Sequence, residues 1–175
     1  SRMHCVMSIF SAMQASALGA HREAVRAWAA ILDKDDAPGD PRQCEQYAFE
    51  LHLTGDIGAA IVWHSRALAI YEKAEDRMHL GDGLRFLSRL HYLNGHRTLS
   101  EQAGQRAVTL LKEFPRTAEL ALAYSNLAHL AMLAEDDEEA VRWSEEAIPI
   151  AEALARDDIL ATVFNNYGTA IQYRD

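Results

Sequence analysis

Histidines are the side chains of this sequence best suited to acid–base or metal chemistry, because an imidazole changes charge near neutral pH and ligates metals. The chain of 175 residues has eight of them. His91 and His96 flank a predicted turn, whereas His129 stands in a separate predicted helix. A zinc site needs three or four converging ligands, and this spacing gathers no such set. We therefore predict exposed or partner-contacting imidazoles and no metal site.

The sequence carries none of the short motifs that mark common catalytic sites. It has no glycine-rich phosphate loop, HExxH, CxxC or nucleophile elbow. Its two cysteines, Cys5 and Cys44, lack metal-ligand spacing, and we interpret them as buried thiols of a cytosolic protein. We expect no enzymatic activity, no catalytic residue and no bound cofactor.

Arg85 and Arg89 are spaced for binding. They stand one helical turn apart, so both guanidinium groups could hold one carboxylate of a partner. An equally open alternative is a solvated helix face whose surface ion pairs contribute little.

Composition narrows the classes of partner. The net charge of −9 argues against binding to a phosphate backbone, which depends on Lys and Arg, so we expect no direct contact with nucleic acid. The apolar runs are short and no signal-peptide pattern is present, which predicts a cytoplasmic protein without a membrane span. A hydrophobic share of 49% suffices for a continuous core in one domain, residues 1–175.

A repeat of forty residues organises the elements that must position these side chains. Shifting the sequence by that length aligns small residues with small residues, and large apolar residues with large apolar residues. The aligned columns are Ala48, Ser88, Ala128 and Gly168; Leu53, Leu93 and Leu133; Ala60, Ser100 and Ala140; Ala67, Ala107 and Ala147; and Ile70, Leu110 and Ile150. A fixed period of this size indicates a solenoid.

Apolar residues recur at helical spacing on both sides of each turn, so each repeat is predicted to be two antiparallel amphipathic helices. The repeats are expected at approximately 2–36, 40–76, 78–115 and 117–156, with a half repeat at 157–175. Asp40 with Pro41, and Thr98 with Glu101, are expected to begin helices. Pro149 is expected to bend or end its helix. The three tryptophans are expected to pack in the core, at Trp28, Trp63 and Trp143.

These residues resemble the tetratricopeptide repeat (TPR). A large apolar residue before a small one at the eighth place, and alanines at the twentieth and twenty-seventh places, match that family's signature, as in Tyr47-Ala48 with Ala60 and Ala67. The resemblance covers nearly the whole chain. It implies an all-α, right-handed superhelical solenoid of antiparallel helix pairs, with about four TPR-like repeats and one extra helix.

The resemblance also implies where a partner would bind, because in this family the first helix of each repeat lines a concave groove. Transferred one by one, the groove positions include Arg42, Glu45, Phe49, His52, Arg85, Arg89, Tyr92, Ser125, His129 and Asn165. Some family members hold a peptide backbone with a ladder of asparagines, which Asn126 and Asn166, one period apart, could provide. The alternative is that each asparagine satisfies a local backbone group. The family's carboxylate clamp of lysines and asparagines is not matched.

Segments such as YSNLAHLAMLAEDDEEAVRWSEEAI look like the helical region of large bacterial LuxR-type regulators that contain an ATPase module. This similarity implies an interaction scaffold or signal-relay module of a transcriptional regulator, with a protein or peptide segment bound in the groove. The alternative is a sensor of a small-molecule inducer, with a pocket near Phe49, Arg85, Arg89 and Tyr92.

Phe164, Tyr167 and Ile171 form an apolar stripe with no second helix after it. Terminal repeats normally carry a polar outer face. We therefore expect the chain to be a fragment of a longer protein, or the stripe to pair two copies in a homodimer.

Overall fold

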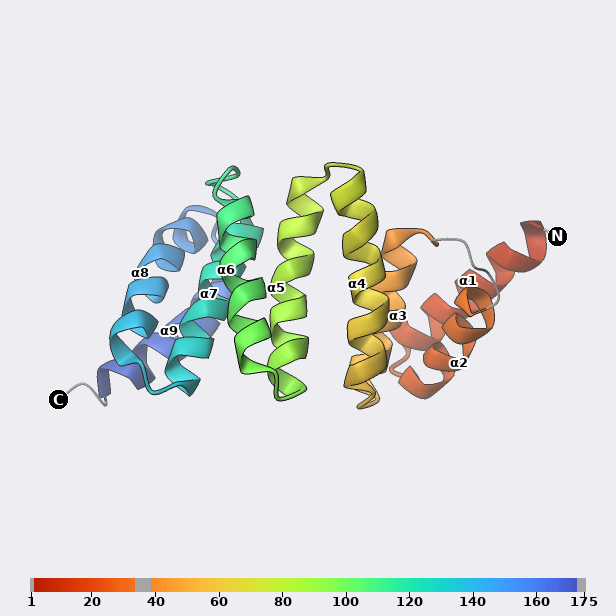
Figure 1. The fold of residues 1–175 in the computed structure, drawn as a ribbon, viewed down its shortest axis with the longest axis horizontal. Helices are drawn as coiled ribbons and strands as arrows, with labels where there is room; N and C mark the ends of the chain where they lie inside the picture. The colour runs from red at the N-terminus through yellow and green to blue at the C-terminus, as the bar shows by residue number, and fades with distance from the viewer. Residues whose placement is uncertain (1, 34–38, 173–175) are drawn as a thin grey trace. The chain divides into compact units, whose positions relative to one another are not determined.

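All regular secondary structure in the described part of the chain is helical (Figure 1). The computed structural model describes residues 2–33 and 39–172, with side chains from residue 7 onward. The helices are α1 (Arg2–Ala17), α2 (His21–Leu32), α3 (Pro41–Leu53), α4 (Ile57–Lys73), α5 (Arg77–Leu93), α6 (Arg97–Leu111), α7 (Ala118–Leu133), α8 (Asp137–Ala153) and α9 (Asp157–Gln172). None of these helices combines the length and the apolar character that a membrane crossing requires. The predicted all-α fold is confirmed, while residues 34–38 and the side chain of Cys5 lie outside the described residues.

The small-residue columns of the sequence repeat form the centre of each hairpin. Ala48, Ser88 and Ala128 in the first helices are fully buried. Their counterparts in the second helices are fully buried too, namely Ala60, Ser100 and Ala140. Short side chains at these places let two helix backbones lie close together at interior packing density. The period of forty residues therefore corresponds to successive helical hairpins, as predicted.

Contacts along the chain define two compact units, Ser1–Glu75 with α1 to α4 and Asp76–Asp175 with α5 to α9. The boundary between them falls where the second predicted repeat gives way to the third. The expectation of one domain stays a prediction.

A buried carboxylate joins three helices of the first unit. Glu50 of α3 is only 1% exposed. One of its oxygens accepts a hydrogen bond from the Ser16 hydroxyl near the end of α1. The other lies 2.7 Å from Nδ1 of His21, the first residue of α2. Because a buried carboxylate is costly without partners, these contacts fix the α1–α2 turn against α3.

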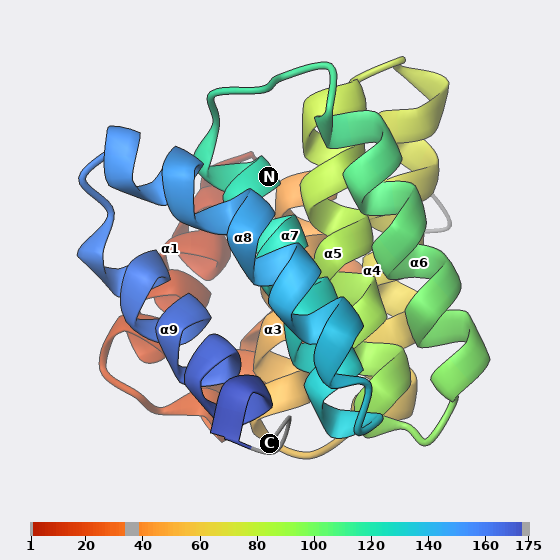
Figure 2. The ribbon, with the colours of Figure 1, turned by 90° about the vertical axis from the view of Figure 1, so that its left-hand side faces the viewer.

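Two asparagines connect the first helices of successive repeats in the second unit. In this unit α7, α8 and α9 pack on one another, and α5 packs on α6 and α7 (Figure 2). Nδ2 of Asn126 in α7 donates to Oγ of Ser88 in α5 at 3.0 Å. One period later, Nδ2 of Asn166 in α9 donates to the carbonyl of Ser125 in α7 at 3.5 Å. Gly104 of α6 makes room for the first contact, since a Cβ there would lie 3.1 Å from Oγ of Ser88.

The turn inside each hairpin contains one residue with left-handed backbone geometry. The φ angle is 72° at Gly19, 91° at Gly55, 77° at Gly95 and 59° at Glu135. Glycine adopts this conformation without steric cost, whereas a residue with a Cβ loses about 1–2 kcal/mol. The hairpin of α7 and α8 therefore keeps the turn geometry although it has Glu135 in place of the glycine.

One of the two predicted helix starts is correct. The side chain of Asp40 accepts from the backbone N–H of Arg42 at 2.9 Å, and Pro41 is the first residue of α3. The helix start predicted at Thr98 and Glu101 is wrong, because α6 begins earlier, at Arg97. Thr98 is thus already inside the first turn, and Glu101 pairs with Arg97 at 2.9 Å.

The predicted end of a helix at Pro149 is wrong. Helix α8 continues to Ala153. Proline removes the hydrogen bond to the carbonyl of Glu145, four residues earlier. Both Pro149 and Glu145 are exposed, so water can satisfy that carbonyl. The predicted bend stays a prediction.

The tryptophans pack inside their units, as predicted. Trp28 is 1% exposed and Trp143 is 8% exposed. The ring of Trp63 lies 5.0 Å from that of Tyr47, and the ring of Trp143 lies 5.7 Å from that of Tyr124. These distances are typical of aromatic pairs that join the two helices of a hairpin.

Replacing His21 with alanine is expected to lower the free energy of unfolding of the first unit by about 1–3 kcal/mol, because Glu50 stays buried and loses a partner. Urea denaturation followed by circular dichroism measures this loss. His79→Ala is the matched control, since His79 also lies 2.7 Å from a carboxylate, that of Asp76, but both side chains are exposed. Exposed pairs of this kind contribute about 1 kcal/mol or less. Equal losses in the two variants would contradict the role of Glu50.

Replacing Asn126 with alanine is expected to destabilise the second unit by about 1–2 kcal/mol, because the α5–α7 hydrogen bond inside the core is lost. Asn165→Ala removes an exposed asparagine of α9 and is expected to change stability by about 0.5 kcal/mol or less. Thermal and urea unfolding of the two variants provide the comparison. A loss at Asn126 no larger than that at Asn165 would argue against the connection.

Candidate functional site

Arg85 and Arg89 lie one turn apart on α5 but in different electrostatic surroundings. Nε of Arg85 donates to a carboxylate oxygen of Asp82 at 2.8 Å. Arg89 is exposed and makes no ion pair with any residue that the structure describes. Partial burial of its guanidinium, and to a lesser extent the charge of Arg85, lower the pKa of Arg89. Arg89 is therefore a cation that an added anion would stabilise.

Tyr92 and His129 continue this face. Tyr92 follows Arg89 by one turn and is 39% exposed. His129 occupies the equivalent place to Arg89 on α7 and is partly buried, with Nδ1 3.4 Å from Oδ1 of Asn166. Because α5 contacts α7 and α7 contacts α9, the first helices of successive repeats are neighbours in this unit. Asn165 is exposed on α9.

Three of the predicted groove residues are not available to a partner in this structure. Ser125, Asn126 and Asn166 are 5%, 8% and 1% exposed. Both asparagines use their side-chain amides inside the unit, in the bonds to α5 and α7 described above. Buried amides need such partners. An asparagine ladder that holds a peptide is therefore corrected to a pair of internal contacts.

The predicted groove residues of the first unit all lie on α3. Arg42 is exposed, and Phe49 is 45% exposed. A carboxylate oxygen of Glu45 accepts from the hydroxyl of Tyr71 in α4 at 2.9 Å. His52 is partly buried, with its ring 6.1 Å from that of Phe49.

His91, His96 and Cys44 are the described residues whose types suggested metal or thiol chemistry. The described side chains include no group of three or more His, Cys, Asp or Glu that could hold a metal ion. The rings of His91 and His96 lie 6.1 Å apart, and burial together with His96 lowers the pKa of His91. Cys44 is 1% exposed, and burial raises the pKa of its thiol. The buried state predicted for Cys44 is therefore confirmed. A buried, protonated thiol is a poor nucleophile.

The predicted apolar stripe of α9 is partly exposed. Phe164 and Ile171 are 50% and 41% exposed, whereas Tyr167 packs against the cluster of Ala140, Val141 and Ala170. Gly168 is exposed, and a Cβ there would meet no atom within 4 Å. Within the described part of the chain, no second helix covers this side of α9.

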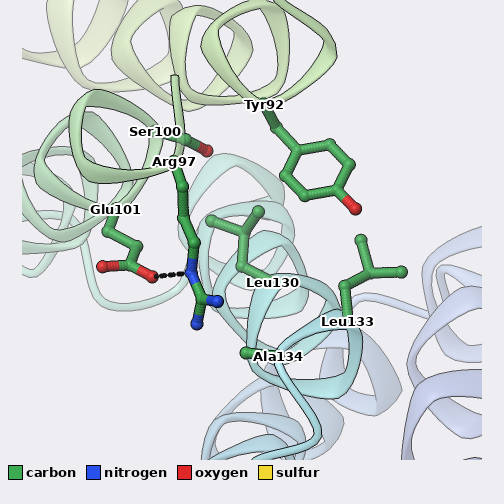
Figure 3. A pocket seen from close by; sticks show the side chains of 7 residues that line it. All are labelled: Tyr92, Arg97, Ser100, Glu101, Leu130, Leu133 and Ala134. Carbon is green, nitrogen blue, oxygen red and sulfur yellow. Dashed lines mark hydrogen bonds and ion pairs between the residues drawn. The ribbon is translucent and has the colours of Figure 1, made fainter. Parts of the chain in front are cut away.

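A small hollow that the sequence did not predict lies beside Tyr92, between α5, α6 and α7 (Figure 3). Its volume is about 210 Å³. Its walls include Tyr92, Arg97, Glu101, Leu130, Leu133 and Ala134. Apart from Tyr92, these residues stand outside the groove positions, so the family pattern does not mark them. The only sign of the hollow in the sequence comes from a shift by one period. This shift aligns Glu101, a charged residue, with Val141 of the next repeat, an aliphatic one.

No family model and no curated protein matches the sequence. Solved structures do match. The chain is similar to the crystal structure of BtubC (BKLC) from P. vanneervenii, at 19% identity and a TM-score of 0.75, over 92% of this chain and 69% of that chain. It is similar to MamA at 14% identity and a TM-score of 0.70, over 87% and 81% of the two chains. A kinesin light chain-like protein of Podosopora anserina with nearly identical TPR-like repeats matches at 14% identity and a TM-score of 0.66, over 98% of each chain. At these identities the similarity concerns the fold, and the chain accordingly has the fold of a TPR-like helical-repeat solenoid.

Proposed function

We propose that this chain binds a protein or peptide partner, and that an acidic segment of the partner docks on the α5 face of the second unit. The observation that carries this proposal is Arg89, an exposed guanidinium without an ion pair among the described residues. Arg85 beside it is already paired with Asp82. A partner carboxylate at Arg89 would gain a charge-assisted hydrogen bond and relieve the repulsion from Arg85.

Aromatic surface next to Arg89 supports an interaction site rather than an ordinary solvated face. An exposed ion pair by itself contributes about 1 kcal/mol or less. Protein interfaces gain most of their energy where Arg and aromatic residues stand together. Tyr92 supplies such a side chain one turn away from Arg89 and is 39% exposed.

The buried asparagines support the site indirectly. By joining α7 to α5 and α9 to α7, they hold the first helices of three repeats in fixed register. A binding face gains affinity when its supporting shell is rigid, since less ordering occurs on association. Asn126 and Asn166 are therefore positioning residues in this proposal.

The wider setting is proposed from the sequence resemblance alone. We place the chain in the cytoplasm, as a non-enzymatic scaffold or signal-relay module of a larger bacterial LuxR-type regulator. A full-length gene that encodes an ATPase module before this segment and a DNA-reading domain after it would support this setting. A gene without either would contradict it.

Pairing of two copies through Phe164, Tyr167 and Ile171 is proposed because α9 has no charged residue from Ile159 to Gln172. Two chains of net charge −9 repel one another less at such a face. Phe164→Glu is expected to reduce the mass measured by light scattering, because it introduces like charges into the contact. Phe10→Glu, at a 63% exposed phenylalanine of α1, serves as the control and should leave the mass unchanged. An unchanged mass for Phe164→Glu, or the same shift in both variants, would contradict the pairing.

Arg89→Ala is expected to weaken binding of acidic peptides by about fivefold, as the loss of one exposed ion pair of about 1 kcal/mol predicts. An array of peptides rich in Asp and Glu, beside copies in which Lys replaces the acids, provides the probe. Fluorescence anisotropy at two salt concentrations then measures affinity, which should fall as salt rises. Arg142→Ala removes an equal charge whose partner is Glu139 and should change affinity little. Equal affinities for the parent chain and Arg89→Ala would reject the site.

A further inference from the structure

The hollow beside Tyr92 lies in a seam, the contact surface between one hairpin (α5 and α6) and the first helix of the next (α7). It opens to solvent beside Tyr92 and Leu133, which are 39% and 41% exposed. Figure 3 shows the ring of Tyr92 on one side, with Leu130 and Leu133 of α7 facing it. Arg97 and Glu101 of α6 stand on the other side and pair with each other at 2.9 Å. The walls are therefore apolar in the middle and polar at one edge.

The next seam of the same unit shows what normally occupies this place. A shift of forty residues carries Tyr92, Ser100, Glu101 and Leu130 onto Met132, Ala140, Val141 and Ala170. These four residues belong to one packed apolar cluster, in which Ala140 and Ala170 are fully buried and Val141 is 8% exposed. The side chain of Glu101, by contrast, is 53% exposed and turned to Arg97. The seam between α6 and α7 thus lacks the aliphatic side chain that closes its neighbour.

We propose that the hollow receives one aliphatic side chain, a leucine or a methionine, from the same acidic partner segment whose carboxylate pairs with Arg89. This inference rests on the proposed function. Arg89 and Tyr92 are three residues apart on α5, so they are neighbours on one helix face. One partner segment can therefore reach both the cation and the hollow.

Size and charge select this occupant. Pockets for drug-sized ligands measure about 300–1,000 Å³, and a hollow of about 210 Å³ is below that range. It suits a single side chain better than a whole small molecule. A carboxylate is a poor occupant, because the nearby cation, Arg97, already holds Glu101. An aliphatic group would cover Leu130 and Leu133 and bury apolar surface that is now exposed to water.

Peptide pairs test the proposal. The probe is a short acidic peptide in which a single leucine is placed at each position in turn, each beside the same peptide with alanine there. Burial of a leucine side chain predicts that the best leucine peptide binds about tenfold more tightly than its alanine partner. Fluorescence anisotropy with the full chain measures both affinities.

Two variants assign the preference to the hollow. Ala134→Leu fills the hollow from its own wall and should abolish the preference for leucine without changing the affinity of the alanine peptide. Ala153→Leu, at an exposed end of α8, is the matched control and should keep the preference. Leu133→Asn, at an exposed position that tolerates a polar side chain, should reduce the preference even if Ala134→Leu folds poorly.

The outcomes separate this inference from the proposed function. If acidic peptides bind through Arg89 but leucine and alanine peptides bind equally, the hollow is not used and the proposed function stands. A leucine preference that survives both Ala134→Leu and Leu133→Asn also rules out the hollow as the place where the leucine binds. If no acidic peptide binds, or if Arg89→Ala binds like the parent, the proposed function fails and this inference fails with it.

Discussion

Close approach of the two helices within each hairpin is the constraint on which the rest of this structure depends. It requires a residue almost without a side chain on each helix at the crossing, and Ala48 with Ala60 and Ala128 with Ala140 satisfy it. The third hairpin has Ser88 and Ser100 there instead. Each hydroxyl donates to the carbonyl of the other serine at 2.7 Å, so two buried polar groups are satisfied without moving the helices apart. The hydroxyl of Ser88 then also accepts the bond from Asn126.

Since the interior of each hairpin is fixed in this way, the seams between hairpins are where repeats can differ. One seam of the second unit is closed by Met132, Val141 and Ala170. Its predecessor has Glu101 turned outward and leaves a hollow. Such a difference changes the surface offered to a partner while the hairpins keep their geometry. Variation in a seam can therefore give a repeat protein a specific binding site without disturbing its hairpins.

The sequence predicts what depends on periodicity and local chemistry. Columns of small residues locate the hairpins, and Asp40 before Pro41 marks a helix start that the structure confirms. It does not predict contacts that depend on three-dimensional register. Glu50 looks like any polar residue of α3, yet it is buried against the α1–α2 turn, where Ser16 and His21 contact it. The amide of Asn126 reaches Ser88 only because Gly104 leaves space, and no pattern within one helix reveals that coincidence.

Arg89 has no carboxylate partner, either nearby in the sequence or among the described residues of the structure. Helical residues pair with charges three or four places away, and around Arg89 those places hold Arg85, Phe86, Tyr92 and Leu93. No carboxylate of its own helix can therefore neutralise it. The structure adds that no described residue of another helix does so either, and that partial burial already disfavours its charge. On a chain of net charge −9, an acidic partner is repelled by most of the surface and attracted where such a cation stands, so charge here selects the place of docking more than it sets the affinity.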